Sequence, residues 1–309
     1  MKIVITGAAG FVGQNLTRVL DKKNTIIAID KHSSNLQLLK ELNPTILTVN
    51  ADLSINGDWE NGFENADCII QLNSQIASKN SEDFIKNNVT ATKNIISSMK
   101  KFNVKRIIHV SSSVVESVAN DDYTNTKKEA ELLVKNSSLD YTVLRPTLMF
   151  GCFDYKHLWW LSKFLDKSPI FPVPGDGKYV RQPLYVVDFC KIIINCFNNK
   201  QHIEKVYDIS GKEKIYYVDL MKLIARKKGI RRLFVNMPTS IFGAILDFYG
   251  LFTKKPIFTS DQMRALINAD EFKLIDCEKS FGIKLTSLNK AWEEIIMSPN
   301  YNLALRKAY

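Results

Sequence analysis

The first thirteen residues, Met1-Lys-Ile-Val-Ile-Thr-Gly-Ala-Ala-Gly-Phe-Val-Gly13, constrain the fold more than any other stretch of the chain. Residues 2–6 form a short β-branched apolar run, as a buried parallel strand requires, and a helical pattern follows the glycines. Gly7 allows a tight turn, Gly10 lets a pyrophosphate approach the backbone, and Gly13 lets the helix pack close to the strand. Because the start of that helix offers N–H groups to phosphates, the stretch predicts a dinucleotide site.

The pattern of strand and helix continues through the first half of the chain. We expect a doubly wound parallel sheet of α/β class, with a ligand outside the carboxyl ends of its strands. After Gly151 the regular alternation of strand and helix ends. No internal repeat or low-complexity segment occurs. The further strands are predicted at residues 25–30, 44–49, 68–72, 105–110 and 141–145, and a continuous helix at residues 82–100.

Composition narrows the class of protein. The five cysteines among 309 residues are odd in number and show no C-x-x-C pair, so we expect reduced thiols, a cytoplasmic protein and no metal site. The first strand begins at residue 2 and no apolar run reaches about 18 residues, so we expect neither a signal peptide nor a membrane span. The net charge of +10 fits anionic small molecules or an anionic membrane surface. No aromatic–basic repeat is present, so nucleic acid is not an expected partner.

Carboxylates at strand ends indicate which cofactor fits. Asp30 closes the second predicted strand, where a carboxylate accepts both adenosine ribose hydroxyls and repels a 2′-phosphate. NAD is therefore favoured over NADP, although Lys31 beside it softens the preference. Asp52 follows the third strand and can accept a hydrogen bond from the adenine amino group.

Tyr123 and Lys127 lie one helical turn apart, after a strand that ends in serines. A phenol is a poor base at pH 7, but a neighbouring ammonium is expected to lower the pKa of Tyr123. Ser112 is the first candidate for orienting a substrate oxygen, and Ser113 the second. This set suits removal of an alcohol proton while hydride leaves the same carbon for NAD.

Several stretches together resemble a known family. Residues 6–13, Asp52-Leu53, Asn88-Val89, the Tyr123/Lys127 pair and Arg145-Pro146-Thr147 are similar to those of extended short-chain dehydrogenases/reductases, nearest to the NAD-dependent epimerase/dehydratase branch. The resemblance covers roughly residues 1–220. It implies a Rossmann domain, a smaller mixed α/β C-terminal domain, retained NAD and a nucleotide-sugar substrate.

The resemblance also implies domain boundaries and site residues. The NAD-binding domain is expected at residues 1–150, with residues 181–200 packing back onto it, and a mainly substrate-binding domain at residues 151–309. Arg181 resembles the family arginine that grips the substrate diphosphate, for which a guanidinium fork is suited. The expected catalytic residues are Tyr123, Lys127, Ser112 and Ser113; the cofactor-binding residues are Gly7, Ala9, Gly10, Phe11, Val12, Gly13, Asp30, Lys31, Asp52, Leu53, Leu72, Asn73, Ser74, Asn88, Lys127 and Pro146; the substrate-binding residues are Ser112, Tyr123, Thr147 and Arg181.

Three features depart from the family pattern. Tyr123 follows Ser113 by only ten positions, about half the usual spacing in sugar epimerases. Val114-Val115-Glu116-Ser117 lacks the usual tyrosine and glycine, and Gln71-Leu72-Asn73-Ser74 replaces an alanine-rich strand end. These features, with the apolar segment before Phe258-Thr259-Ser260-Asp261-Gln262, are more similar to relatives of the 39-kDa accessory subunit of respiratory complex I.

The leading hypothesis is an NAD-dependent C4 epimerase of a nucleotide- or lipid-diphosphate-linked sugar in surface polysaccharide precursor synthesis. A keto-sugar reductase is the nearest variant. A dehydratase of the same family is less favoured, because Ser113 and Val114 stand where dehydratases carry an Asp-Glu pair. A non-catalytic NAD(P)-binding subunit or assembly factor is the alternative from another class.

Residues 239–252 are apolar on most faces and have Arg231-Arg232 and Lys254-Lys255 on either side. A buried helix of the domain or of a homodimer is favoured over a helix on the inner face of a membrane, because the segment lacks a sharp amphipathic stripe. Peripheral contact with anionic lipid stays the alternative.

Overall fold

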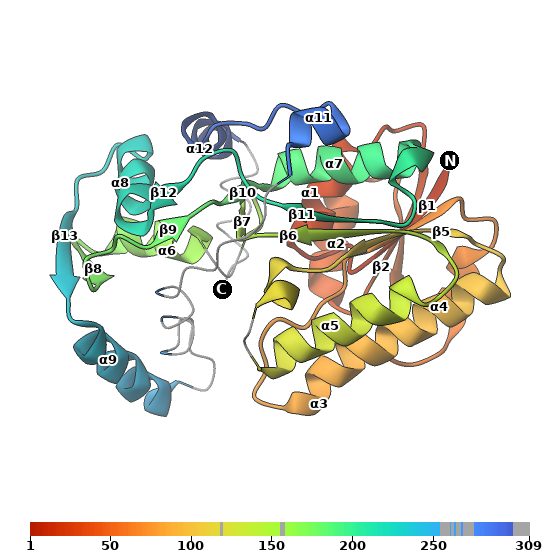
Figure 1. Cartoon of the computed structure of the whole chain (residues 1–309), viewed down its shortest axis with the longest axis horizontal. Coiled ribbons are helices and arrows are strands. Elements are labelled where there is room, and N and C mark those ends of the chain that lie inside the picture. The colour runs from red at the N-terminus through yellow and green to blue at the C-terminus, as the bar shows by residue number, and fades with distance from the viewer. Residues whose placement is uncertain are drawn as a thin grey trace. The chain divides into compact units, whose positions relative to one another are not determined.

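The computed structural model describes residues 1–117, 120–154, 158–253, 260, 263, 267 and 275–298. The chain divides into two compact units (Figure 1). The first comprises the described residues within 1–147, 186–209 and 272–284, and the second those within 148–185, 210–271 and 285–309.

The first unit contains a seven-stranded sheet with the order β11-β6-β5-β4-β1-β2-β3, in which every pairing is parallel. Each strand is short and largely β-branched, as the buried runs predict. The third strand begins at Leu47 and not at Pro44, because a proline lacks the N–H that the ladder needs. The strands are β1 (Lys2–Thr6), β2 (Thr25–Asp30), β3 (Leu47–Asn50), β4 (Cys68–Gln71), β5 (Arg106–Val110), β6 (Asp140–Pro146) and β11 (Lys205–Ile209).

The strand order reverses at β1. Its neighbours are β2 on one side and β4 on the other, and the chain crosses from one side to the other between β3 and β4. In a doubly wound sheet the ligand crevice lies at this switch point, outside the carboxyl ends of the strands. The fold is therefore the Rossmann-type sheet that the sequence predicts.

Helices cover both faces of this sheet, with α7 on one side and α4 and α5 on the other (Figure 1). Alternate β1 residues face opposite ways, so Val4 joins the cluster of Ile69, Ile95 and Ile107 on the α4 side. On the other side α1 packs against α7. The helices of the unit are α1 (Phe11–Val19), α2 (Ser33–Leu42), α3 (Ser81–Phe84), α4 (Ala91–Lys101), α5 (Asp122–Lys135), α7 (Val186–Asn198) and α11 (Cys277–Phe281), with 3₁₀ turns η1 (Asp58–Phe63), η3 (Ser113–Glu116) and η4 (Lys200–His202).

One helix departs from the prediction. Instead of a continuous α-helix over residues 82–100, α3 is followed by a π-helical segment, η2 (Ile85–Thr90), which leads into α4. The wider turn places Asn87 and Asn88 toward the segment that follows β4, where both make hydrogen bonds. π-Segments of this kind occur frequently at functional sites.

The second unit is built around aromatic side chains. Phe150 stacks on Trp292 with ring centroids 5.5 Å apart, and Phe171 contacts Phe164 and Phe234. Its elements are β7 (Met149–Phe150), α6 (Leu158–Lys167), β8 (Ile170–Pro174), β9 (Val180–Arg181), β10 (Leu184–Tyr185), β12 (Ile215–Tyr216), α8 (Tyr217–Lys227), β13 (Leu233–Met237), α9 (Thr239–Phe252) and α12 (Leu288–Met297).

Helix α9 has the predicted bounds, but it is not buried within the domain, and its burial between two copies of the chain stays a prediction. Gly243 is its only buried residue, and the large apolar residues Ile241, Phe248 and Leu251 are exposed. The sequence pattern could not separate a core helix from a surface helix, because both are apolar on most faces. Within the part of the chain that the structure describes, no helix is long and apolar enough to cross a membrane. Of the segment Phe258-Thr259-Ser260-Asp261-Gln262, all but Ser260 lies outside the described residues.

Candidate active site

The glycine turn after β1 has the geometry of a phosphate cradle. Gly7 adopts a left-handed φ of +69°, and a Cβ there would lie 2.4 Å from the backbone nitrogen of Asn73. A Cβ on Gly13 would lie 2.2 Å from the Ala8 carbonyl oxygen. These two glycines are required by packing. Gly10 differs, since a Cβ there would meet only the Gly7 carbonyl oxygen, at 3.2 Å.

Gly10 is also the N-cap of α1 and makes no side-chain cap. The first N–H groups of the helix, at Phe11, Val12 and Gly13, therefore have no side-chain acceptor at this end. An anion that lies over Gly10 would receive these N–H groups and the favourable end of the helix dipole. The turn thus fits the diphosphate of a dinucleotide.

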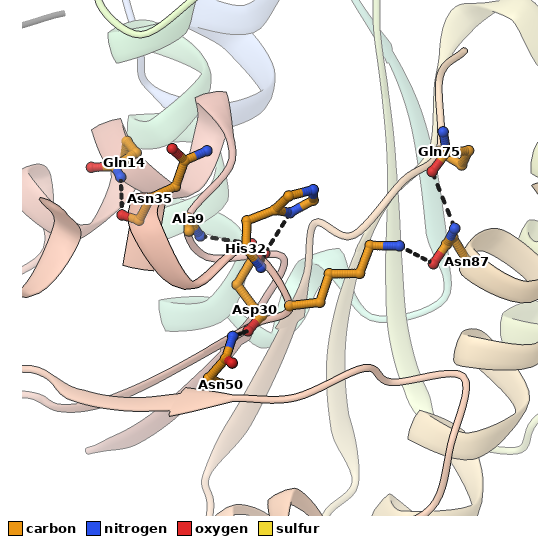
Figure 2. A network of polar contacts seen from close by, with 9 residues as sticks. Ala9, Gln14, Asp30, His32, Asn35, Asn50, Gln75 and Asn87 are labelled. Carbon is orange, nitrogen blue, oxygen red and sulfur yellow. Dashed lines mark hydrogen bonds and ion pairs between the residues drawn. The ribbon is translucent and has the colours of Figure 1, made fainter. Parts of the chain in front are cut away.

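Asp30, at the carboxyl end of β2, is buried beside this turn (Figure 2). Its Oδ2 accepts the Ala9 N–H at 2.9 Å, and its Oδ1 accepts the His32 N–H at 2.9 Å and contacts the His32 ring at 3.0 Å. A carboxylate has about four acceptor positions, so Oδ2 retains one for a ribose hydroxyl. Lys31 points away from the carboxylate and donates to Asn87 Oδ1 at 2.6 Å.

The remaining predicted cofactor residues lie at the neighbouring strand ends. Asp52 accepts the Ser54 N–H and hydroxyl; burial raises the pKa of Asp52, but these bonds and the Lys31 and Lys86 charges hold it below its ordinary value. Leu53 is buried in the core, so any contact it makes with a ligand is through its backbone. Asn73 receives the Thr6 hydroxyl at 2.9 Å, and the Leu72 N–H donates to the Thr6 carbonyl.

The Asn88 side chain links the segment after β4 to helix α5 by hydrogen bonds. Its Oδ1 accepts the Gln75 N–H at 2.7 Å, and its Nδ2 donates to the Gln75 carbonyl and to Thr126 Oγ1. The segment after β4 is thereby held against α5. Both polar atoms of the Asn88 amide are used inside the chain, which ties the position of α5 to that of the β4 end.

Helix α5 carries the predicted catalytic pair and begins at an Asp121 cap that accepts the Thr124 N–H at 2.8 Å. Tyr123 is half-buried, and Ser112 and Ser74 are the side chains near enough to its hydroxyl to act on its pKa. Ser112 is the half-buried N-cap of η3, whereas Ser113 is buried as the first residue of η3. The structure therefore places Tyr123 where the ends of β4 and β5 meet.

Burial raises the pKa of Tyr123, and the Ser112 and Ser74 side chains act against the rise. The lowering expected from Lys127 together with the charge of a nicotinamide stays a prediction. The Lys127 ammonium donates to the Val110 carbonyl oxygen at 2.9 Å. Burial lowers the pKa of Lys127 itself to about 8, with the Glu131 carboxylate acting against the fall.

Glu131 continues the same face of α5 one turn beyond Lys127 and is anchored by β6. Arg145 Nε and Nη2 donate to its two carboxylate oxygens at 3.0 and 2.6 Å. The other Arg145 terminal nitrogen pairs with Glu116 of η3. The Glu116 that departs from the family pattern therefore helps to hold η3, and with it Ser112.

A buried network of hydrogen-bonded side chains joins the strands and helices that carry this site. His109 Nδ1 lies 2.8 Å from Gln71 Oε1, Gln71 Nε2 donates to Thr92 Oγ1 at 2.7 Å, and Thr92 donates to the Asn88 carbonyl at 2.6 Å. Burial, followed by the Lys127 charge, holds the pKa of His109 well below its ordinary value, so the ring is neutral. This network connects β5, β4, α4 and the π-segment.

The last predicted substrate residues divide between the units. Pro146 ends β6, and the Thr147 N–H donates to the Ile209 carbonyl in the first unit. Arg181 lies in β9 of the second unit, paired with Ile215 of β12, and its charge opposes the rise that burial causes in the pKa of Tyr217. Asp188 is the third residue of α7 and pairs with Lys191 at 3.1 Å.

Gln71 and His109 were not predicted as active-site residues, and Ser74 was predicted as a cofactor-binding residue but not as a neighbour of Tyr123. Gln71 was visible only as a departure from the family pattern, and His109 carried no signal at all. No group of His, Cys, Asp and Glu suited to a metal ion occurs among the described residues.

Comparison with known proteins identifies the family. Residues 3–210 match the model of the NAD dependent epimerase/dehydratase family. The chain is 23% identical over 274 residues to NADH dehydrogenase [ubiquinone] 1 alpha subcomplex subunit 9 of Rattus norvegicus, covering 86% of this chain and 71% of that one.

Two solved structures share the fold over nearly the whole chain. One is the UDP-glucuronic acid 4-epimerase of Bacillus cereus with UDP-glucuronic acid and NAD, at TM-score 0.73, 21% identity and 99% coverage of both chains. The other is epimerase Mth375 of Methanothermobacter thermautotrophicus, at TM-score 0.82 and 17% identity, covering 99% of this chain and 94% of that one.

Proposed function

This chain belongs to the NAD dependent epimerase/dehydratase family, and from that premise we propose that it is an NAD-dependent C4 epimerase of a diphosphate-linked sugar. The observation that carries the proposal is the Tyr123 hydroxyl, near Ser112 and Ser74 with Lys127 one turn along the helix. The sugar is carried on a nucleotide or a lipid, as in the synthesis of surface polysaccharide precursors.

Each residue of the site has a separate role in this proposal. Gly10 and the start of α1 hold the NAD diphosphate, and the remaining acceptor position of Asp30 holds the adenosine ribose. When bound, NAD accepts hydride from the sugar carbon and returns it. Tyr123 takes the proton of the sugar hydroxyl and returns it to the same oxygen after the keto sugar has turned its other face to the cofactor side, while Ser112 orients that oxygen.

Ser112 is preferred to Ser113 for this role because it lies near the Tyr123 hydroxyl and Ser113 is buried in η3. We propose that the Lys127 ammonium and the positive charge of the bound nicotinamide together favour the phenolate that proton removal requires. Arg181 is proposed to bind the substrate diphosphate from the second unit, with the first unit binding NAD. This division makes the first unit the cofactor domain and the second mainly the substrate domain.

The test is turnover with added NAD against UDP-linked and polyprenyl-diphosphate-linked hexoses, with products separated by stereochemistry. We expect epimer formation that Tyr123→Phe reduces by about 10²-fold or more, the range for loss of an acid–base group. Tyr141→Phe is the matched control, because Tyr141 packs against the core and not in the site. Equal activity in the two variants would remove Tyr123 from the mechanism.

Three other functions make different predictions in the same assay. A keto-sugar reductase would consume reduced cofactor stoichiometrically, and a dehydratase would release water from the sugar. A non-catalytic NAD(P)-binding subunit is favoured by the similarity to the complex I subunit over 86% of the chain. That function would give NAD binding without turnover of any sugar.

A further inference from the structure

Helix α9 carries an uncovered apolar stripe. Ile241, Ile245, Phe248 and Phe252 recur once per turn, and their exposed fractions are 52%, 52%, 64% and 76%. At 100° per residue these four lie within one narrow arc of the helix. Phe248 and Phe252 touch each other edge to face with centroids 5.0 Å apart. We call these four residues the α9 stripe.

The stripe is not the side by which α9 packs on its own unit. Gly243 is buried, and Phe242 and Leu246 are half-buried, so these residues form the inner face. The helix therefore has one apolar side toward the protein and another toward solvent. A contiguous exposed apolar surface of this kind marks a site of interaction.

Positive charge precedes the stripe in the chain. Residues 226–232 read Arg-Lys-Lys-Gly-Ile-Arg-Arg, with no acidic residue among them. Lys228 pairs with Asp166, whereas Arg226 and Arg231 are exposed. We call residues 226–232 the basic cluster. It leads through β13, where Leu233 and Val235 are exposed, to Pro238 and α9.

We propose that the α9 stripe and the basic cluster bind the surface of an anionic lipid bilayer. A helix that lies in the membrane interface buries its apolar face at the acyl boundary while nearby basic side chains attract anionic headgroups. A second copy of the chain fits less well, because a two-fold contact would bring two basic clusters together. This surface goes beyond the proposed function and does not depend on it.

The test is sedimentation of the full chain with phosphatidylglycerol vesicles and with phosphatidylcholine vesicles at low salt. We expect pelleting with phosphatidylglycerol, weakened at high salt, and much weaker pelleting with phosphatidylcholine. Phe248→Glu should reduce the partition coefficient about tenfold or more. Ile55→Glu is the matched control, since Ile55 is 66% exposed but lies in the first unit. Arg226→Gln/Arg231→Gln should weaken only the phosphatidylglycerol arm.

An unchanged circular dichroism spectrum and urea transition confirm that each variant has folded, so the result does not rest on sugar turnover. Absence of pelleting by the unmodified chain at low salt would overturn the proposal. Equal pelleting by Phe248→Glu and Ile55→Glu would also overturn it. So would a concentration-dependent dimer in analytical ultracentrifugation that Phe248→Glu abolishes without vesicle binding, because the stripe would then be an interface between copies.

Discussion

Lys127 has a side chain that is 2% exposed, which is unusual for a lysine outside a functional site. Burial brings its pKa to about 8, whereas an unfolded chain has a value near 10.4. Below pH 8 the lysine is charged in both states, and the folded state carries the cost of a buried ammonium. That cost is about 3 kcal/mol and disappears as the pH rises through 10.4.

We therefore predict that Lys127→Met makes the cofactor-free protein more stable at pH 7 by about 1–3 kcal/mol while abolishing turnover. The lost hydrogen bond to the Val110 carbonyl, about 1 kcal/mol, keeps the gain below the full cost. Urea unfolding at pH 7 and pH 10 measures the difference, which should shrink at pH 10. Lys128→Met, an exposed neighbour, should show no such pH dependence. Equal destabilisation by Lys127→Met at both pH values would contradict this account.

The sequence is informative about single residues where the signal is local. The four-residue spacing of Tyr123 and Lys127 places them on one face of a helix, and the structure has that helix. Ser74 was predicted as a cofactor residue, but its position beside Tyr123 could not be found in this way. Ser74 lies near Tyr123 because β4 adjoins β5 and the π-segment holds α5 in place, and neither follows from residues near Ser74.

At the scale of an element, the three glycines between β1 and α1 have different roles. We predict that Gly10→Ala still folds with a modest loss of stability, because its Cβ would meet only the Gly7 carbonyl oxygen at 3.2 Å, but binds NAD at least about tenfold more weakly, because that Cβ would also meet the diphosphate. Gly13→Ala should fail to fold, since its Cβ would lie 2.2 Å from the Ala8 carbonyl oxygen. Urea unfolding and titration with NAD measure the two effects. Normal NAD affinity in Gly10→Ala would place the diphosphate elsewhere.

The buried pair of Gln71 and His109 joins strands β4 and β5 and is testable by a double-mutant cycle. Gln71→Leu alone leaves the buried His109 Nδ1 without its partner, so we expect destabilisation of about 1–3 kcal/mol. His109→Leu alone leaves Gln71 Oε1 in the same position. The double variant should lose less than the sum, with a coupling of about 1–2 kcal/mol in urea unfolding. Additive losses would show that the two side chains are independent.

Regular elements were predictable where one pattern dominates. The bounds of α9 follow from an apolar run between polar residues. The bounds of β11, Lys205–Ile209, are likewise those that the sequence predicts for a strand. The π-segment at residues 85–90 was not predictable, because its residues are compatible with an ordinary helix. Its conformation coincides with the hydrogen bonds that Asn87 and Asn88 make with residues before α3, which are tertiary contacts.

At the scale of the whole molecule, the first unit is discontinuous in sequence. Strand β11 and helix α7 come from residues after 185, yet β11 pairs with β6 along five residues, and α7 packs against α1. Without them, β6 becomes an unpaired edge and the α1 face of the sheet loses the cover of Phe189, Ile192 and Ile193. The 148–185 excursion leaves the sheet and returns at nearly the same place, since the Leu184 N–H donates to the Leu148 carbonyl at 2.8 Å.

This geometry makes a prediction about fragments. Residues 1–147 alone should aggregate or unfold without cooperativity, because the exposed β6 edge and uncovered sheet face are aggregation sites. Joining residue 147 to residues 186–209 through a linker of about five Gly and Ser residues should restore a cooperative urea transition, because the two ends lie close together and short flexible linkers span such gaps. The linked fragment should also bind NAD in isothermal titration, since Gly10 and Asp30 remain in place. Cooperative unfolding of residues 1–147 alone would show that residues 186–209 are not needed for the sheet to fold. Failure of the linked fragment as well would mean that α11, which the fragment lacks, or the second unit contributes to folding of the first.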